Sequence, residues 1–403
     1  IIVKKTSGLQ HWAAFHRSLG EGKIIYPNRT NAAADNTSVW NNTAPTSTSF
    51  SVSTSNNSNE SGQTYIAYLF AHNNGDGEFG PTGDQDIIKC GSVSYNGGAS
   101  VDLGFEPQWV LIKPSNNTGN WILNDVMRGM PNGSRGPRLD ADGSGAEIAN
   151  GTVVYPTSTG FTMPSGLYDP TDLIYIAIRR GPMAVPDSAT DVFSIATTGT
   201  PDTVDFRPEN VDMAMFAKRG GDSENFQIAD RIRTFQSTSL NSDNGYTSPT
   251  LETNTSDAEA TSSTCIHQSN LITSTGPTIR ATTDGSNFLF YRWKRAPNYF
   301  DIVAYTGNGS AGRNINHNLG VAPEMIWVKK RSGVEGWAVY HKLNGGTHFL
   351  RLHNNNAYED NHNVWNDTDA TDSVFTVDTD TEVNTSGQTY IAYLFASLDG
   401  VSK

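Results

Sequence analysis

The sequence contains very little cysteine and no long apolar run. Cys90 and Cys265 are the only cysteines in 403 residues, so a disulfide framework cannot hold this chain together. We interpret both as unpaired small hydrophobic residues, with a disulfide or a redox role as the alternative. No apolar stretch approaches the roughly 18 to 20 residues of a membrane span. We therefore expect no membrane insertion.

Charge is also scarce, and basic charge in particular. Charged residues make up 17% of the chain, the net charge is −13 and the pI is about 5.1. Because phosphate binding needs a basic surface, this balance argues against a nucleic-acid partner.

The residues that are abundant favour β-structure. Hydrophobic residues reach 36% and aromatic residues 10%, which is too apolar for a disordered chain. Helix formers such as Ala, Leu, Glu and Lys are sparse, whereas Thr, Val, Ile and aromatic residues, which suit pleated sheets, are common. The composition predicts an all-β protein.

One stretch of eleven residues, SGQTYIAYLFA, occurs twice, at residues 61–71 and 386–396. At this offset of 325, 34 of the 71 positions from Ile1 to Ala71 are identical, with no gap. Such similarity indicates a duplicated domain. An offset that spans three units gives a period of about 108 residues, with two fainter copies between.

The fainter copies are recognised by their opening and closing strands. LGFEPQWVLIK (103–113) matches LGVAPEMIWVK (319–329), and DLIYIAIRR (172–180) resembles the closing strand. VDMAMFAKRGG (211–221) and NFLFYRWKR (287–295) mark the most diverged copy. Short strands separated by Gly, Asn, Asp and Ser predict a small antiparallel, jelly-roll-like β-sandwich in each unit.

The four predicted units cover residues 1–85, 86–187, 188–298 and 299–403. The first is incomplete, since Ile1 aligns with Ile326, some 26 residues into a unit that begins near Phe300. We therefore expect the chain to be part of a longer polypeptide. In the closing strand, Tyr65 and Leu69 face one side while Ile66 and Tyr68 face the other. We expect one side in the unit's own core and the other against a neighbouring unit or another chain.

Candidate binding residues are few, and no catalytic motif appears. Trp40 and Trp365 occupy matched positions; each is read as a core tryptophan at a strand start, with a carbohydrate contact as the alternative. His16 and His341 also match, which predicts a shared structural role. We name no catalytic residue, no cofactor and no metal ligand.

Two acidic, glycine-rich stretches are candidates for calcium loops. NNGDGEFG (73–80) and DADGSGAE (140–147) bring oxygen ligands together, but neither has the EF-hand spacing. We interpret both as solvated turns, with calcium binding as the alternative.

The unit opening NGS…LG..P..I.VK and the closing strand N.SG..YIAY.FA resemble a repeat domain of virion structural proteins of tailed bacteriophages, particularly marine ones. The resemblance covers essentially the whole chain and supplies no active-site residues. It implies a non-enzymatic tail fibre or appendage, exposed on the virion outside the cell and acting in host attachment. Fibres of this kind are usually homotrimers, so the expected partners are further copies of the chain and other virion proteins.

Two other functions stay open on the sequence. A capsid decoration or head-fibre protein of similar build would stabilise the particle. A carbohydrate-binding, lectin-like module would contact host surface glycans, because β-sandwiches serve many functions.

Overall fold

The structure is a computed structural model of the 403-residue chain. It describes all residues except 81–82, 127–129, 131–137, 149–150, 152, 169, 182–183, 198–202, 206–210, 219–224, 231, 234–247, 263–277 and 281–287. Cys265 and parts of the third predicted unit lie outside the described residues. The all-β prediction is confirmed, and both described α-helices are only four residues long.

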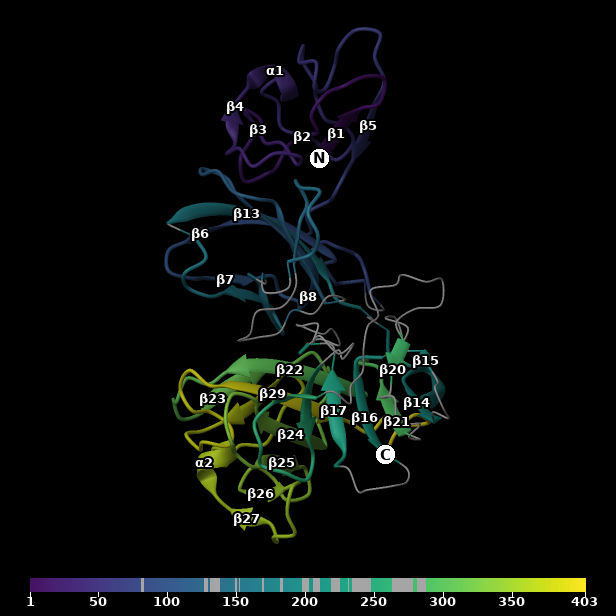
Figure 1. Ribbon diagram of the computed structural model, residues 1–403, viewed down its shortest axis with the longest axis vertical. Helices are drawn as coiled ribbons and strands as arrows, with labels where there is room; N and C mark the ends of the chain where they lie inside the picture. The colour runs from purple at the N-terminus through teal and green to yellow at the C-terminus, as the bar shows by residue number, and fades with distance from the viewer. Residues whose placement is uncertain are drawn as a thin grey trace. The chain divides into compact units, whose positions relative to one another are not determined.

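The fourth unit, here called repeat 4, is a sandwich of two antiparallel layers (Figure 1). The main layer is a six-stranded sheet of order β22-β29-β24-β25-β26-β27, and the second layer is the pair β23-β28. The elements of this repeat are β22 (Phe300–Thr306), β23 (Arg313–Asn316), β24 (Met325–Lys330), β25 (Trp337–His341), β26 (His348–Arg351), β27 (Glu359–Asp360), α2 (His362–Trp365), β28 (Val374–Val377) and β29 (Thr389–Phe395).

Repeats 2 and 3 use the same strand order, which confirms the predicted repetition. Their main sheets run β6-β13-β8-β9-β10 and β14-β21-β16-β17-β18-β19, and their second layers contain β7-β12 and β15-β20. Repeat 2 has β6 (Ile88–Tyr95), β7 (Ala99–Asp102), β8 (Pro107–Pro114), β9 (Ile122–Asp125), β10 (Leu139–Asp140), β11 (Tyr155–Thr157), β12 (Gly160–Met163) and β13 (Thr171–Arg179). Repeat 3 has η1 (Ala189–Asp191), β14 (Phe193–Thr197), β15 (Thr203–Asp205), β16 (Met213–Lys218), β17 (Gln227–Asp230), β18 (Ser248–Glu252), β19 (Ala260–Ser262), β20 (Thr278–Arg280) and β21 (Phe288–Trp293).

Repeat 1 has strands equivalent to β25, β24 and β29 of the main sheet of repeat 4. Its sheet has the order β2-β1-β5, beside the short pair β3-β4. Its elements are β1 (Ile2–Lys5), β2 (Ala13–Ala14), β3 (Lys23–Ile24), β4 (Ala34–Asp35), α1 (Thr37–Trp40) and β5 (Tyr65–Tyr68). The register agrees with repeat 4: Val3 pairs with Ala13 and Ala67, as Val328 pairs with Ala338 and Ala392. The offset of 325 seen in the sequence therefore holds in three dimensions.

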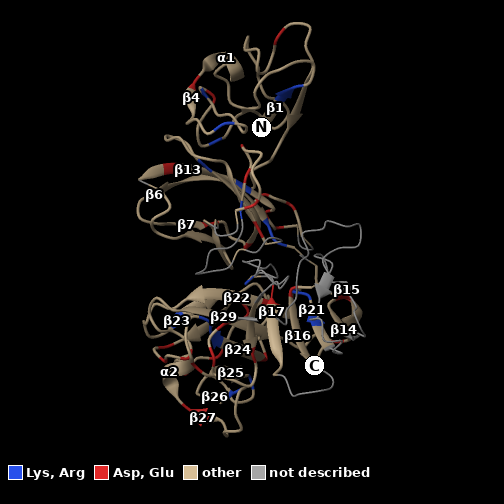
Figure 2. Ribbon diagram, viewed as in Figure 1, with Lys and Arg blue, Asp and Glu red and all other residues tan. Residues whose placement is uncertain are grey.

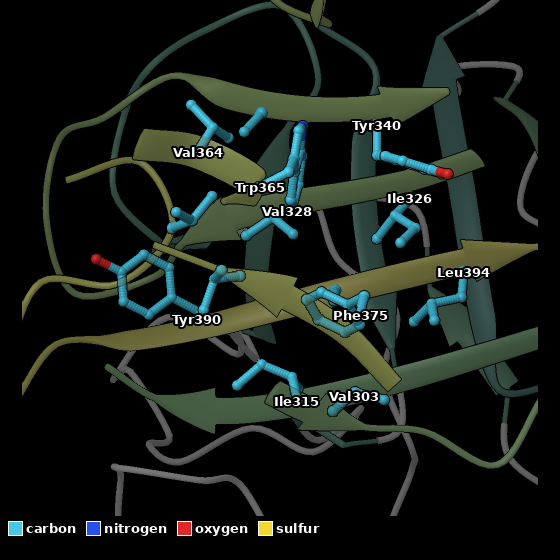
Figure 3. Packing of buried hydrophobic residues seen from close by; sticks show 14 of the residues in the cluster. Val303, Ile315, Ile326, Val328, Tyr340, Val364, Trp365, Phe375, Tyr390 and Leu394 are labelled. Atoms are coloured by element: carbon cyan, nitrogen blue, oxygen red, sulfur yellow. The ribbon is translucent and has the colours of Figure 1, made fainter. Parts of the chain in front are cut away.

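The core of repeat 4 lies between its two layers. In Figure 3, Phe375 and Ile315 of the second layer lie opposite Val328, Ile326 and Leu394 of the main sheet, and all five are buried. Strand β29 is apolar on both sides because each side is covered.

The two sides of β29 have different neighbours. Tyr390, Ala392 and Leu394 belong to the core of repeat 4, whereas Ile391 and Tyr393 belong to a cluster shared with repeat 3. The expectation of one side in the unit's own core and the other against a neighbouring unit is confirmed here.

The chain divides into two compact units, each built of two repeats. The first contains residues 1–125, 137–154 and 160–180; the second contains 126–136, 155–159 and 181–403. Repeat 1 and most of repeat 2 therefore lie in one unit, while repeats 3 and 4 lie in the other together with residues 126–136, 155–159 and 181–187 of repeat 2.

Candidate functional site

Trp40 and Trp365 are core tryptophans, as the leading interpretation had them, and the alternative of a carbohydrate contact is wrong. The two residues are 2% and 1% exposed, so neither indole face is accessible to a sugar ring. Each tryptophan is the last residue of a single-turn helix, whereas a position at the start of a strand was expected. Asn36 and Asn361 cap these helices by accepting a backbone hydrogen bond, which aims each tryptophan inward.

The matched histidines share a local role, as predicted. Nδ1 of His16 accepts from the Ser18 N–H at 3.3 Å, and Nδ1 of His341 accepts from the Leu343 N–H at 3.2 Å. His16 also lies 3.1 Å through Nε2 from the Tyr175 carbonyl of repeat 2. Since Nδ1 accepts, the neutral ring carries its proton on Nε2 and donates it to that carbonyl. Burial lowers the pKa of His16 to about 4.

Carboxylates in and beside the two acidic loops accept hydrogen bonds from backbone N–H groups of the protein. Asp86 accepts from the backbone N–H groups of Gly75 and Gly77, which closes the 73–80 loop. In the 140–147 loop, Asp142 accepts from the Trp121 N–H at 2.7 Å. Among the described residues, no three His, Cys, Asp or Glu side chains gather as metal ligands would.

A cavity of about 460 Å³ lies within the first compact unit. It is lined mainly by apolar side chains, with His16 and Cys90 on its wall. Cys90 is buried and unpaired, as expected for it. Burial raises the pKa of the Cys90 thiol and lowers that of His16, so both are neutral at pH 7. The cavity thus offers apolar contact and no charged group from these two residues.

The most developed polar arrangement joins repeat 1 to repeat 2. Among the hydrogen bonds between them, four surround Trp121 and Lys113: Trp121 Nε1 to Tyr26 O at 2.9 Å, Lys113 Nζ to Thr30 O at 2.9 Å, Gly119 N to Thr30 O at 2.9 Å and Ala33 N to Ser115 O at 2.8 Å. Behind them Ala14 and Ile25 of repeat 1 pack on Trp121 and Ile174 of repeat 2.

Repeats 3 and 4 are joined by four equivalent hydrogen bonds. They are Trp337 Nε1 to Glu252 O at 2.8 Å, Lys329 Nζ to Ser256 O at 3.4 Å, Glu335 N to Ser256 O at 2.8 Å and Glu259 N to Arg331 O at 2.9 Å. The apolar side consists of Ile228 and Leu251 of repeat 3 against Trp337 and Ile391 of repeat 4.

The two interfaces match residue by residue. Repeat 2 residues become repeat 4 residues at an offset of 216 (113 to 329, 121 to 337), and repeat 1 residues become repeat 3 residues at an offset of 226 (26 to 252, 30 to 256). The buried lysines also agree, because burial lowers the pKa of Lys113 and of Lys329 to about 8. We call this shared geometry the docking interface.

The docking interface of repeats 3 and 4 carries an added ionic network. Arg233, fully buried, contacts Asp230 at 2.5 Å and Glu259 at 3.3 Å, and Arg331 contacts Glu259 at 2.8 Å. Burial disfavours the charged form of Arg233, but Asp230, Tyr393 and Glu259 outweigh it and raise its pKa. In the first interface, Ala33 stands at the position of Glu259 and Ser115 at that of Arg331. The backbone hydrogen bond between the two positions is therefore present without these charges.

The docking interface was not predicted from the sequence, although one signal was present. At the offset of 325 Trp12 matches Trp337, and Lys4, Lys113 and Lys329 each follow a β-branched apolar residue in a strand. A lysine that recurs in an apolar strand is a candidate for a buried, backbone-bonded group. Its acceptors are carbonyl oxygens, which are chemically alike at every residue, so their positions left no sequence signal.

The chain belongs to the DUF7483 family, a domain of unknown function, which matches residues 1–171 and 196–403. The first stretch runs through repeats 1 and 2 to the start of β13, the second runs from the end of β14 through repeats 3 and 4, and each includes the four hydrogen bonds of one docking interface. No curated protein and no solved structure matches the chain. Within the described residues, no helix has the length and apolar character needed to cross a membrane.

Proposed function

We propose that this chain is a structural, non-enzymatic component of a bacteriophage virion, a tail fibre or appendage built of tandem β-sandwich repeats that serves host attachment. The observation that carries the proposal is the docking interface, which occurs twice with the same four hydrogen bonds. A chain that repeats both its domain and its domain contact is organised as an array, in which each repeat is stabilised by its neighbour.

Three further features support this function. The repeat motifs resemble those of phage virion proteins. The buried lysine and tryptophan at matched positions of repeats 2 and 4 serve docking. Acidic and basic residues are interspersed along the described chain (Figure 2), with an acidic balance overall, as suits a surface in contact with medium.

The experiment that tests the proposal is localisation on the particle. Fab fragments raised against the purified chain would be imaged by cryo-electron microscopy on virions whose genome encodes this chain. Fab density along an extension from the tail is the expected result. Density spread over the capsid lattice would indicate a decoration protein and not a fibre. Fab density on no part of the virion would overturn the proposal.

A further inference from the structure

The two docking interfaces share their backbone contacts but differ in the side chains around them. We call residues 26–33 of repeat 1 and 252–259 of repeat 3 the docking segments, because their backbone groups make the hydrogen bonds described above. These backbone groups, and the lysine and tryptophan that donate to them, are the same in both interfaces. They hold a docking segment in place, but they cannot distinguish one segment from the other.

The interface of repeats 3 and 4 adds an ionic set of side chains. Nε and Nη2 of Arg331 donate to the two carboxylate oxygens of Glu259, at 2.8 and 3.1 Å, so this ion pair is bidentate. The Tyr393 hydroxyl accepts from Arg233 at 3.1 Å and donates to Asp230 at 2.6 Å. Members of the set come from both repeats, so the set is complete only when repeats 3 and 4 are docked.

The interface of repeats 1 and 2 has apolar or small residues at four of the five matched positions and a histidine at the other. Strand pairing and the offsets of the docking interface define the matches. In the order Asp230, Arg233, Glu259, Arg331 and Tyr393, the residues found in repeats 1 and 2 are His16, Leu19, Ala33, Ser115 and Ile176. We call these five the apolar set. Leu19 and Ala33 pack beside Trp121 and Ile174, where the ionic set has a buried arginine and a glutamate.

Repeat 3 has two covalent neighbours on which it could dock. The chain joins it directly to repeat 2 on one side and to repeat 4 on the other. Both of these repeats have the lysine and the tryptophan that bind a docking segment. Tethering raises the local concentration of both neighbours, so it does not by itself select one of them. A selection needs side chains that differ between repeats 2 and 4, and the two sets provide them.

We propose that the two sets form a selection code, in which the ionic set directs repeat 3 to repeat 4 and the apolar set directs repeat 1 to repeat 2. On repeat 2, the docking segment of repeat 3 would keep its backbone hydrogen bonds, but Glu259 would face Ser115 and Arg233 would face Ile176. Removing one partner of a buried ion pair is strongly unfavourable, because the remaining charge is left uncompensated. The code thus works largely by rejecting the wrong neighbour.

The converse mismatch is also unfavourable. Arg331 is 4% exposed, and its guanidinium would face the methyl group of Ala33 if repeat 1 docked on repeat 4. The Tyr393 hydroxyl, which is fully buried, would lose both Asp230 and Arg233. The code therefore discriminates in both directions, and it applies equally to a repeat offered by a second copy of the chain.

The test identifies the repeat that receives the docking segment of repeat 3. Asp257, at an exposed position within this segment, is replaced by the photoreactive residue p-benzoylphenylalanine in the full 403-residue protein. After refolding from urea and irradiation, the captured peptide is identified by mass spectrometry. We expect capture of repeat 4, with at least about tenfold less capture of repeat 2, since loss of a buried ionic partner is worth that factor or more.

Exchange of the code residues between repeats 2 and 4 should redirect the segment. The changes are Ser115→Arg, Ile176→Tyr, Arg331→Ser and Tyr393→Ile. The probe at position 257 should then capture repeat 2. In the matched control, the code residues of repeats 1 and 3 are exchanged as well, which restores both sets and should restore capture of repeat 4. The added changes are His16→Asp, Leu19→Arg, Ala33→Glu, Asp230→His, Arg233→Leu and Glu259→Ala.

A double-mutant cycle decides the case in which the exchanged proteins do not fold. Glu259→Ala and Arg331→Ser are compared, singly and together, by urea unfolding of the full protein. Each single variant leaves a buried charge without its partner. Their combined effect on the unfolding equilibrium constant should therefore fall at least about tenfold short of the product of the two single effects.

Three results would overturn the proposal. They are equal capture of repeats 2 and 4 by the native protein, capture of repeat 4 after the four-residue exchange, and independent effects of the two substitutions in the cycle. None of these outcomes depends on the proposed place in a virion.

Discussion

The same eleven residues form two strands in very different surroundings. At 386–396 the segment is the second strand of a six-stranded sheet, and Ile391, Tyr393 and Leu394 are buried. At 61–71 it is an edge strand, and the matching residues are exposed. The sequence is the same in both places, and the pairing of β5 with β1 matches that of β29 with β24, so the difference in exposure comes from the other neighbours of β29. A strand that is apolar on both sides suits a position between two covering layers. Of the two copies, only the one in repeat 4 is covered on both sides.

The largest difference is expected from a charge placed at the matched leucines. Leu394→Asp puts an unpaired carboxylate in the core of repeat 4 and should destabilise that repeat by about 5 kcal/mol. Leu69→Asp should change the unfolding free energy by less than about 0.5 kcal/mol, because the side chain is in solvent. Urea unfolding of both variants measures this. Equal losses would show that the two strands are covered alike.

The next effect is a pH dependence at the contact between repeats 1 and 2. Burial lowers the pKa of His16 from 6.5 to about 4, so the folded state binds fewer protons than the unfolded state between these pH values. Stability is therefore fully present above pH 6.5 and falls as the pH drops toward 4, by up to about 3 kcal/mol. The control is His16→Gln, whose stability should vary less with pH over this window. A curve of the same slope in the variant would contradict the assignment to His16.

A smaller difference should appear at the matched tyrosines. The Tyr393 hydroxyl donates to Asp230 at 2.6 Å and accepts from Arg233 at 3.1 Å, in a fully buried network. Tyr393→Phe should cost about 2 kcal/mol, because it leaves buried charged groups short of a partner. Tyr68→Phe, on the exposed copy, should be neutral within about 0.5 kcal/mol. Thermal unfolding followed by calorimetry compares the two.

The smallest expected difference concerns two buried tryptophans of repeat 4. Trp337 Nε1 donates across the docking interface to Glu252 O, whereas the buried Trp365 Nε1 has no acceptor among the described residues. Both substitutions by Phe remove similar volume, but only Trp337→Phe also leaves a carbonyl unpaired, at a cost of about 1 kcal/mol. If Trp365→Phe were the more damaging of the two, the docking hydrogen bond would contribute little.

Much of the fold could be predicted from the sequence, because repetition and alternation are local signals. The match of Ile1–Ala71 to the last repeat fixed the register of β1, β2 and β5, and the two-sided strand predicted a contact with a neighbouring unit. The sequence alone did not decide whether Trp40 and Trp365 are buried or bind carbohydrate. Polar residues surround each tryptophan in sequence, whereas the apolar core surrounds it in space. The docking interface was missed because half of it is backbone.

The most direct test of this account is hydrogen exchange in the two copies of SGQTYIAYLFA within one protein. Their intrinsic exchange rates are equal because their sequences are identical, so any difference reports structure alone. Peptic fragments that include the neighbouring residues distinguish them by mass, since Glu60 and His72 flank the first copy and Thr385 and Ser397 the second. We predict that amides of residues 66–69 on the open edge of β5 exchange at least about 100-fold faster than their counterparts in 391–394. Equal protection of the two copies would contradict the edge position of β5.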